Sequence, residues 1–182
     1  MLSGETAKGK YPLEAVQVMS KLCREAEAAV FYQSIFNEIR ATTPRPCDTT
    51  EASASSAVNA SLEQDAKAIL VLTTTGDTAG LVSKYRPQIP IFCITRDAQT
   101  ARQAQLFRGV YPLQYPAKAS PESKTQMAEW QEDVDTRFYW AMREAVQMNL
   151  LKVGDKVVTL QGWRGGQGTF TSLKLLDSSV SS

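Results

Sequence analysis

A run of hydroxyl side chains is the first feature of the sequence that could bind a ligand. The run consists of Thr73, Thr74, Thr75, Gly76, Asp77 and Thr78. It follows an apolar segment and precedes a helical pattern, so its hydroxyls and free backbone N–H groups could hold an anion, which a helix dipole attracts. The alternative is that a threonine or Asp77 only caps the helix. The pattern predicts either a phosphate site or a helix cap.

A second candidate is an arginine on a long helical pattern. Trp130 and Arg137 are seven residues apart, so on a helix both side chains return to nearly the same face. The guanidinium group of arginine can bind a phosphate through two parallel hydrogen bonds. The alternative is an ordinary ion pair between Arg137 and Asp133, which lies four residues earlier. Both interpretations stay open at the level of sequence.

A third candidate is a glycine-rich segment between two strand-like runs. Residues 162–168 contain four glycines. A purely structural hairpin would need only a two-residue turn, so a closing loop with one positive charge is a reasonable hypothesis, and a flexible hairpin tip is the alternative. The loop contains neither a Walker motif nor the GxGxxG spacing of dinucleotide-binding proteins. The residues concerned are Arg164, Gly165, Gly166, Gln167, Gly168 and Thr169.

Alternating strands and helices must position these candidates. Short apolar runs at 66–72, 89–95 and 109–113 are typical of strands buried on both faces, and helical patterns separate them. This order predicts an α/β fold with a mostly parallel sheet and flanking helices. The runs at 156–161 and 169–176 predict a C-terminal antiparallel hairpin. Ligands of such sheets bind at the carboxyl ends of the strands, where the run of hydroxyls lies.

Further helices precede and follow this alternating region. Helices are predicted at about 12–29, where Pro12 suits the first helical position, at 33–40, at 52–60 after an acidic N-cap signature, and at 130–149. The Pro44-Arg45-Pro46 break predicts a boundary between a domain of residues 1–43 and one of residues 44–182. A polar stretch at 116–128 is predicted to be a mobile surface loop.

Composition excludes several classes of function. The chain has 182 residues and a net charge of +1, which disfavours a nucleic-acid or anionic-membrane partner. It has no histidine, so imidazole catalysis is excluded, and its three cysteines form no CxxC pair that would suggest zinc or disulfides. We expect two of these cysteines to be small core residues. No apolar run is long enough to span a membrane, and we expect a cytoplasmic protein.

Several motifs together resemble a known family. They are the segments 1–9 and 11–16, followed in order by 84–87, 95–96, 100–103 and 108–112. In sequence and spacing the chain is similar to the C-terminal part of pyruvate kinase, over roughly residues 1–176. The resemblance implies a partial pyruvate kinase that comprises the regulatory domain and the last strand and helix of the catalytic barrel.

The resemblance implies a function for all three candidate segments. In the family this domain binds a sugar bisphosphate effector, usually fructose 1,6-bisphosphate, and the enzyme is a tetramer. The segment from Thr73 to Thr78 matches the loop that binds one phosphate. Trp130 and Arg137 match residues that bind the other, and the loop from Arg164 to Thr169 matches the one that closes over the ligand. The catalytic groups and the Mg²⁺ and K⁺ sites belong to upstream segments, so this chain is expected to be inactive and to bind no metal.

Two residues depart from the family pattern, and one alternative function stays open. Some activated members have a lysine where this chain has Thr74, and Asp77 places a carboxylate where a phosphate would approach. The loop at 117–128 is also longer than is usual in the family.

The alternative to an effector-binding domain is a non-binding module for oligomerisation or interaction. An independent nucleotide-binding enzyme is disfavoured because both histidine and the GxGxxG motif are absent.

Overall fold

The computed structural model describes residues 2–116, 127–162 and 171–177, and of residues 127–130 and 171–177 it describes the backbone. The chain divides into two compact units, Met1–Tyr32 and Gln33–Ser182. Within the described residues, no helix is both long and apolar enough to cross a membrane.

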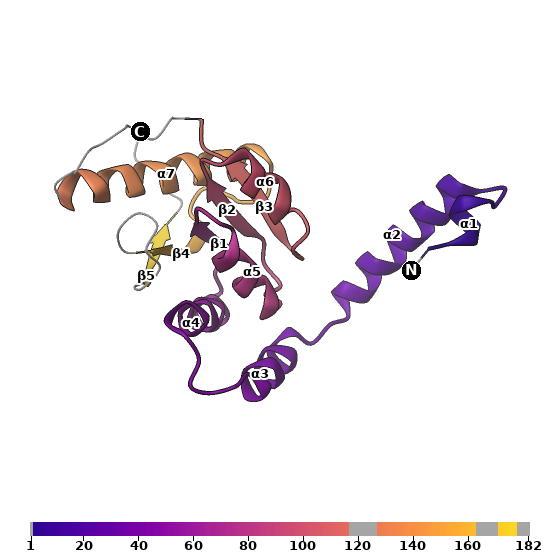
Figure 1. Ribbon diagram of the computed structural model, residues 1–182, viewed down its shortest axis with the longest axis horizontal. Helices are drawn as coiled ribbons and strands as arrows, with labels where there is room; N and C mark the ends of the chain where they lie inside the picture. Colours follow the sequence, from indigo (N-terminus) through magenta and orange to yellow (C-terminus); the bar gives the residue numbers. More distant parts are fainter. Residues whose placement is uncertain (1, 117–126, 163–170, 178–182) are drawn as a thin grey trace. The chain divides into compact units, whose positions relative to one another are not determined.

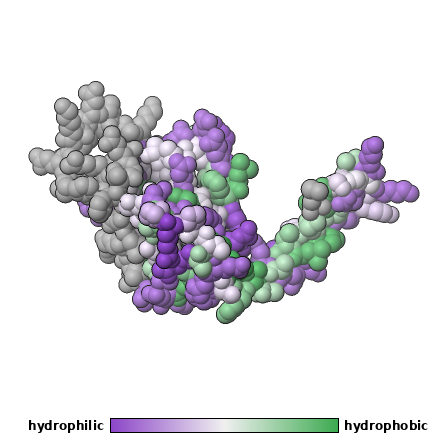
Figure 2. All heavy atoms as spheres, turned by 60° about the horizontal axis from the view of Figure 1, so that its bottom comes forward, coloured by the Kyte–Doolittle hydropathy of each residue, from purple (hydrophilic) through white to green (hydrophobic). Residues whose placement is uncertain are grey.

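The first unit consists of two helices, α1 (Gly4–Ala7) and α2 (Pro12–Ala28). Pro12 stands at the start of α2, where its missing N–H group leaves no donor unpaired, and the predicted helix is confirmed. No residue of α2 is buried. Figure 2 shows hydrophobic side chains gathered along this helix, which include Leu13, Val16, Val18 and Leu22.

The second unit begins at Gln33, the second residue of α3 (Tyr32–Thr42), and continues with α4 (Thr49–Glu63). The side chain of Asp48 caps α4 by accepting a hydrogen bond of 2.7 Å from the backbone N–H of Glu51. This is the acidic N-cap that the sequence predicts. Phe36 of α3 is 1% exposed, and its ring lies 5.9 Å from the ring of Tyr85. Helix α3 therefore packs into the core of the larger unit, while the predicted domain boundary at residue 44 stays a prediction.

A five-stranded sheet in the order β3-β2-β1-β4-β5 forms the centre of the larger unit. Strands β1 (Ala68–Leu72), β2 (Ile91–Thr95), β3 (Val110–Gln114) and β4 (Lys156–Gly162) are parallel. Strand β5 (Thr171–Asp177) pairs antiparallel with β4. The predicted α/β fold, with its mostly parallel sheet and C-terminal hairpin, is confirmed.

Helices cover both faces of the sheet (Figure 1). Side chains alternate along a strand, so Ile69 and Val71 of β1 pack on the same side as α4 and α5 (Asp77–Lys84). Ala68 and Leu70 point to the other face, where they pack against α7 (Met127–Gln147). The short helix α6 (Ala98–Ala104) lies between β2 and β3 in the sequence and adds Ala104 to the first core. The helical crossovers place the loops after β1 and β2 at one edge of the sheet.

The cysteines do not follow the sequence expectation. Cys93, on the central strand β2, is buried, and burial raises the pKa of its thiol to about 11. Cys23 and Cys47 are exposed. The expectation of two core cysteines is therefore wrong, because the apolar stripe of α2 that carries Cys23 is not covered.

Candidate functional site at the carboxyl edge of the sheet

The turn after β1 is organised around Gly76. This glycine is the N-cap of α5 and has φ +89°, a left-handed conformation that side chains with a Cβ rarely adopt. The hydroxyl oxygen of Thr73 accepts a hydrogen bond of 3.0 Å from the N–H of Gly76 and so fixes the turn. The N-cap residue Gly76 has no side chain to cap α5, but the hydroxyl oxygen of Thr75 accepts a hydrogen bond of 3.4 Å from the N–H of Asp77, the first residue of α5. The capping alternative for a threonine therefore stays open.

The donors of this turn are partly used within it. The hydroxyl of Thr75 donates to the carboxylate of Asp77 over 2.8 Å, and both residues are exposed. The backbone N–H groups of Thr78 and Ala79 have no acceptor in the part of the chain that the structure describes. These two N–H groups, at the positive end of the dipole of α5, are the free donors that an anion could use.

The loop after β2 lies directly beside this turn. Leu72 of β1 pairs in register with Ile94 of β2, so Thr74 and Arg96 each follow this pair by two residues. The two loops are joined by a hydrogen bond of 2.8 Å from the hydroxyl of Thr100 to the carbonyl oxygen of Thr74. Arg96 and the run of hydroxyls therefore both lie at the carboxyl ends of neighbouring strands, at the same edge of the sheet.

Arg96 is linked to Arg137 through a single carboxylate. Its Nη2 donates to Oδ1 of Asp133 over 2.7 Å. Arg137 donates to the other oxygen, Oδ2, and its Nε donates to the backbone oxygen of Asp133 over 3.2 Å. The ion pair between Arg137 and Asp133, which the sequence left as an alternative, is present. The structure adds a second arginine to that pair.

The arginine pair is half-buried and carries an excess of positive charge. The Arg137 side chain is 16% exposed. Burial lowers the pKa of Arg137, the charge of Asp133 opposes this, and the nearby charge of Arg96 lowers the pKa further. Arginine starts from so high a pKa that Arg137 stays charged at neutral pH. The formal charges of Arg96, Arg137 and Asp133 sum to +1, which attracts an anion, whereas Asp77 and Asp97 add negative charge at the same edge.

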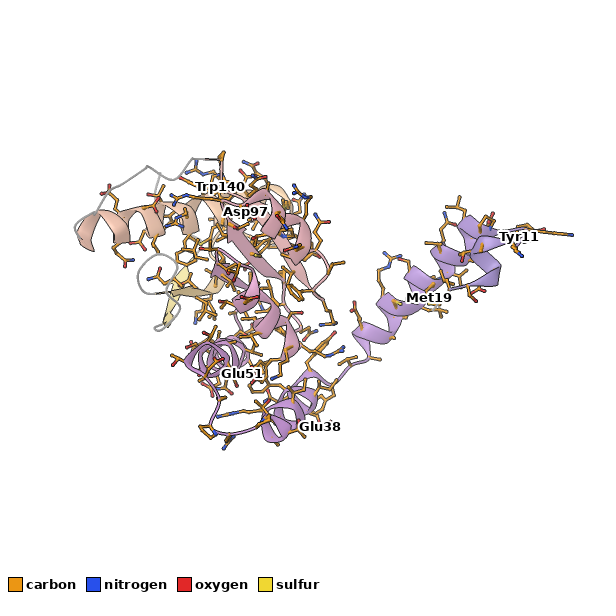
Figure 3. The ribbon with its side chains drawn as sticks, viewed as in Figure 1. Tyr11, Met19, Glu38, Glu51, Asp97 and Trp140 are labelled. Atoms are coloured by element: carbon orange, nitrogen blue, oxygen red, sulfur yellow. The ribbon has the colours of Figure 1, made fainter. Side chains whose placement is uncertain are left out.

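Aromatic rings lie beside the arginine pair. The guanidinium carbon of Arg96 lies 5.7 Å from the centre of the Tyr115 ring, and this ring meets the Trp140 ring edge-on at 5.1 Å. Figure 3 shows Asp97 at the start of α6 and Trp140 on α7. The side chain of Asp97 accepts from the N–H of Thr100 over 2.6 Å, which caps α6 and lowers the pKa of Asp97.

Two separate sets of contacts involve the predicted site residues. Thr100 joins the turn of residues 73–78 to the loop after β2, and Asp133 joins Arg96 of that loop to Arg137, while α5 and α7 pack on opposite faces of the sheet. Trp130 lies on α7, and its side chain is outside the described residues. The predicted loop at 116–128 lies almost entirely outside them. So do Arg164, Gly165, Gly166, Gln167, Gly168 and Thr169.

Sequence reasoning missed Arg96 and Tyr115 as members of this site. The available signal was position, because Arg96 directly follows β2 as the run of hydroxyls follows β1, and Tyr115 directly follows β3. Among the described residues, no group of three or more histidine, cysteine, aspartate or glutamate side chains could hold a metal ion. The free N–H groups of the turn and the guanidinium of Arg137 are groups that could bind an anion.

Comparison with known proteins agrees with this architecture. The family model described as pyruvate kinase, alpha/beta domain, matches residues 51–176. A pyruvate kinase of Candida albicans is 47% identical over 178 residues, which cover 98% of this chain and 34% of that protein. Pyruvate kinases of Agaricus bisporus and Schizosaccharomyces pombe are each 48% identical over 176 residues. The alignments cover 97% and 96% of this chain, and 32% and 33% of those proteins. The chain spans about a third of the length of these relatives.

Proposed function

The chain belongs to the pyruvate kinase family, and on that premise we propose that it is the effector-binding part of such an enzyme. The parent enzyme transfers a phosphoryl group from phosphoenolpyruvate to ADP in glycolysis, in the cytoplasm, with Mg²⁺ and K⁺. The chain itself is expected to form no pyruvate, because phosphoryl transfer depends on positioned charges from segments outside the chain. Its function is to bind a sugar bisphosphate and to form subunit contacts in a tetramer.

The observation that carries this proposal is the shared sheet edge. One phosphate would bind to the turn of residues 73–78, where the N–H groups of Thr78 and Ala79 are free and α5 presents its positive end. The other would bind to Arg137, whose terminal nitrogen Nη1 has no acceptor among the described residues. Trp130 would lie beside this phosphate, and residues 164–169 would close over the sugar.

Isothermal titration with fructose 1,6-bisphosphate tests the proposal. We expect saturable binding by the unmodified chain and at least about tenfold weaker binding by Arg137→Gln, since the variant loses a charged fork for phosphate. Arg143→Gln is the matched control, because Arg143 is exposed on the same helix. An absence of heat up to millimolar ligand, or equal affinities of both variants, would contradict the proposal.

One observation favours the alternative function, a module for subunit contacts that binds no effector. The apolar residues of α2 are exposed, and a partner could cover them. Sedimentation in the presence and absence of fructose 1,6-bisphosphate separates the two functions. Self-association of a chain that shows no ligand binding would favour the alternative.

A further inference from the structure

Asp133 holds two arginines from different elements at once. Its Oδ1 accepts from Arg96, at the end of β2, and its Oδ2 accepts from Arg137, one turn further along α7. Two guanidinium groups this close repel each other, so the carboxylate between them is what allows both to stay. Each carboxylate oxygen of Asp133 thus accepts a hydrogen bond from one of the two arginines.

The bonds to Asp133 use two of the three nitrogens of the Arg137 guanidinium and leave the third, Nη1. Its Nε and Nη2 both donate to Asp133, which orients the plane of the guanidinium, and Nη1 has no acceptor among the described residues. Arginine has five N–H groups, so donors remain for a ligand after these bonds are made. A phosphate that approaches Nη1 would meet a group that is already oriented.

Arg96 is held in place on its other side but is incompletely paired. Its guanidinium stands over the Tyr115 ring, and its Nε is buried without an acceptor. A buried N–H group without an acceptor lowers the stability of the fold, so another interaction of Arg96 must offset this cost. The ion pair with Asp133 is that interaction. In the part of the chain that the structure describes, Arg96 and Arg137 are the two cations that contact this carboxylate.

We propose that Arg96 is a positioning residue of the phosphate site. Arg96 fixes Asp133, Asp133 fixes the guanidinium plane of Arg137, and Nη1 of Arg137 faces the phosphate group of the ligand. The proposal rests on the proposed function, since it assigns Arg96 to the same effector site. A change at Arg96 then weakens ligand binding without removing any group that the ligand was predicted to touch.

Titration with fructose 1,6-bisphosphate of two variants at this position tests the proposal. We expect Arg96→Gln to weaken binding about tenfold, and Arg96→Lys to recover part of that loss because lysine keeps the charge and one bond to Asp133. The control Arg102→Gln removes the same charge from an exposed position on α6 and is expected to change affinity less than about twofold. Should Arg96→Gln fail to fold, Arg96→Lys against Arg102→Lys gives the comparison.

A second measurement is independent of the ligand. The ¹⁵N side-chain resonance of Arg137 Nε, recorded without ligand, is expected to shift in Arg96→Gln and to stay unchanged in Arg102→Gln. If the unmodified chain binds no bisphosphate, the proposed function fails, and this resonance alone decides whether Arg96 positions Arg137. If the chain binds but Arg96→Gln behaves like its control in affinity and in spectrum, the inference about Arg96 is overturned and the proposed function stands.

Discussion

Asp77 is the residue that most opposes an anion at the turn after β1. It is exposed, stands in the first turn of α5 and accepts a hydrogen bond from Thr75. A carboxylate in that position stabilises the helix in the same way that a bound phosphate would. The local pattern of hydroxyls therefore combines an attraction for phosphate with a competing negative charge.

The variant Asp77→Asn is expected to bind fructose 1,6-bisphosphate about threefold more tightly. Asparagine keeps a hydrogen-bonding side chain but removes a like charge, whose effect is limited by its exposure to water. Isothermal titration measures the change. Glu38→Gln, an exposed glutamate on α3, is the control for loss of one negative charge. Unchanged or weaker binding by Asp77→Asn would place the ligand away from this turn.

Helices α3, α4 and α5 are joined by contacts that no single sequence pattern reveals. Glu51 of α4 accepts from Nζ of Lys84 over 2.6 Å and from the hydroxyl of Tyr85 over 2.5 Å, and the Tyr85 ring meets Phe36 of α3. Burial by itself would raise the pKa of Glu51, but the two hydrogen bonds and the charge of Lys84 lower it below its ordinary value of 4.5. The charged form of Glu51 therefore stabilises the packing of α4 against α5.

Glu51→Gln is expected to lower the free energy of unfolding by about 1 kcal/mol at pH 7, because Lys84 is partly exposed and water screens the pair. A lowered folded-state pKa means that this stabilisation is complete above the ordinary pKa of glutamate and is lost as the pH falls through the folded value. Urea unfolding at pH 7 and below pH 4 measures it. The difference between Glu51→Gln and the unmodified chain should shrink in acid. Glu38→Gln, at an exposed position of α3 that Figure 3 labels, should change little at either pH. A difference that grows in acid would contradict this account.

The elements of the larger unit could be predicted from local patterns. The apolar run around β1 and the Asp48 cap of α4 act over a few residues, so the sequence contains their signals directly. The bridge from Arg96 through Asp133 to Arg137 could not be predicted in the same way. It depends on the register of β1 with β2 and on the packing of α7 across the sheet, both of which are long-range.

At the scale of the whole molecule, the two units differ in how much apolar surface they cover. The larger unit buries two cores, one on each face of its sheet. Helix α2 of the first unit buries none of its residues, and Leu13 is 64% exposed. Sequence reasoning expected a stripe of this kind on α2. Exposed apolar surface of this extent favours association.

The 182-residue chain is therefore expected to self-associate through α2. The pair Val18→Glu and Leu22→Lys should reduce association, because it puts charges one helical turn apart on the apolar stripe. Sedimentation velocity over a range of concentrations measures the effect. The matched pair Gln17→Glu and Ser20→Lys, at exposed polar positions of the same helix, should leave association unchanged. Equal behaviour of the two pairs would show that α2 is not the contact.

The central claim is that the run of hydroxyls and Arg137 bind one ligand, with Arg96 holding Arg137 in place. A titration of the ¹⁵N-labelled chain with fructose 1,6-bisphosphate tests this most directly, because it reports every backbone amide separately. We predict saturable shifts with one common affinity at the amides of Thr74–Ala79 and at Arg96 and Arg137. Shifts confined to one of these two groups, or no shift at either up to millimolar ligand, would contradict the account.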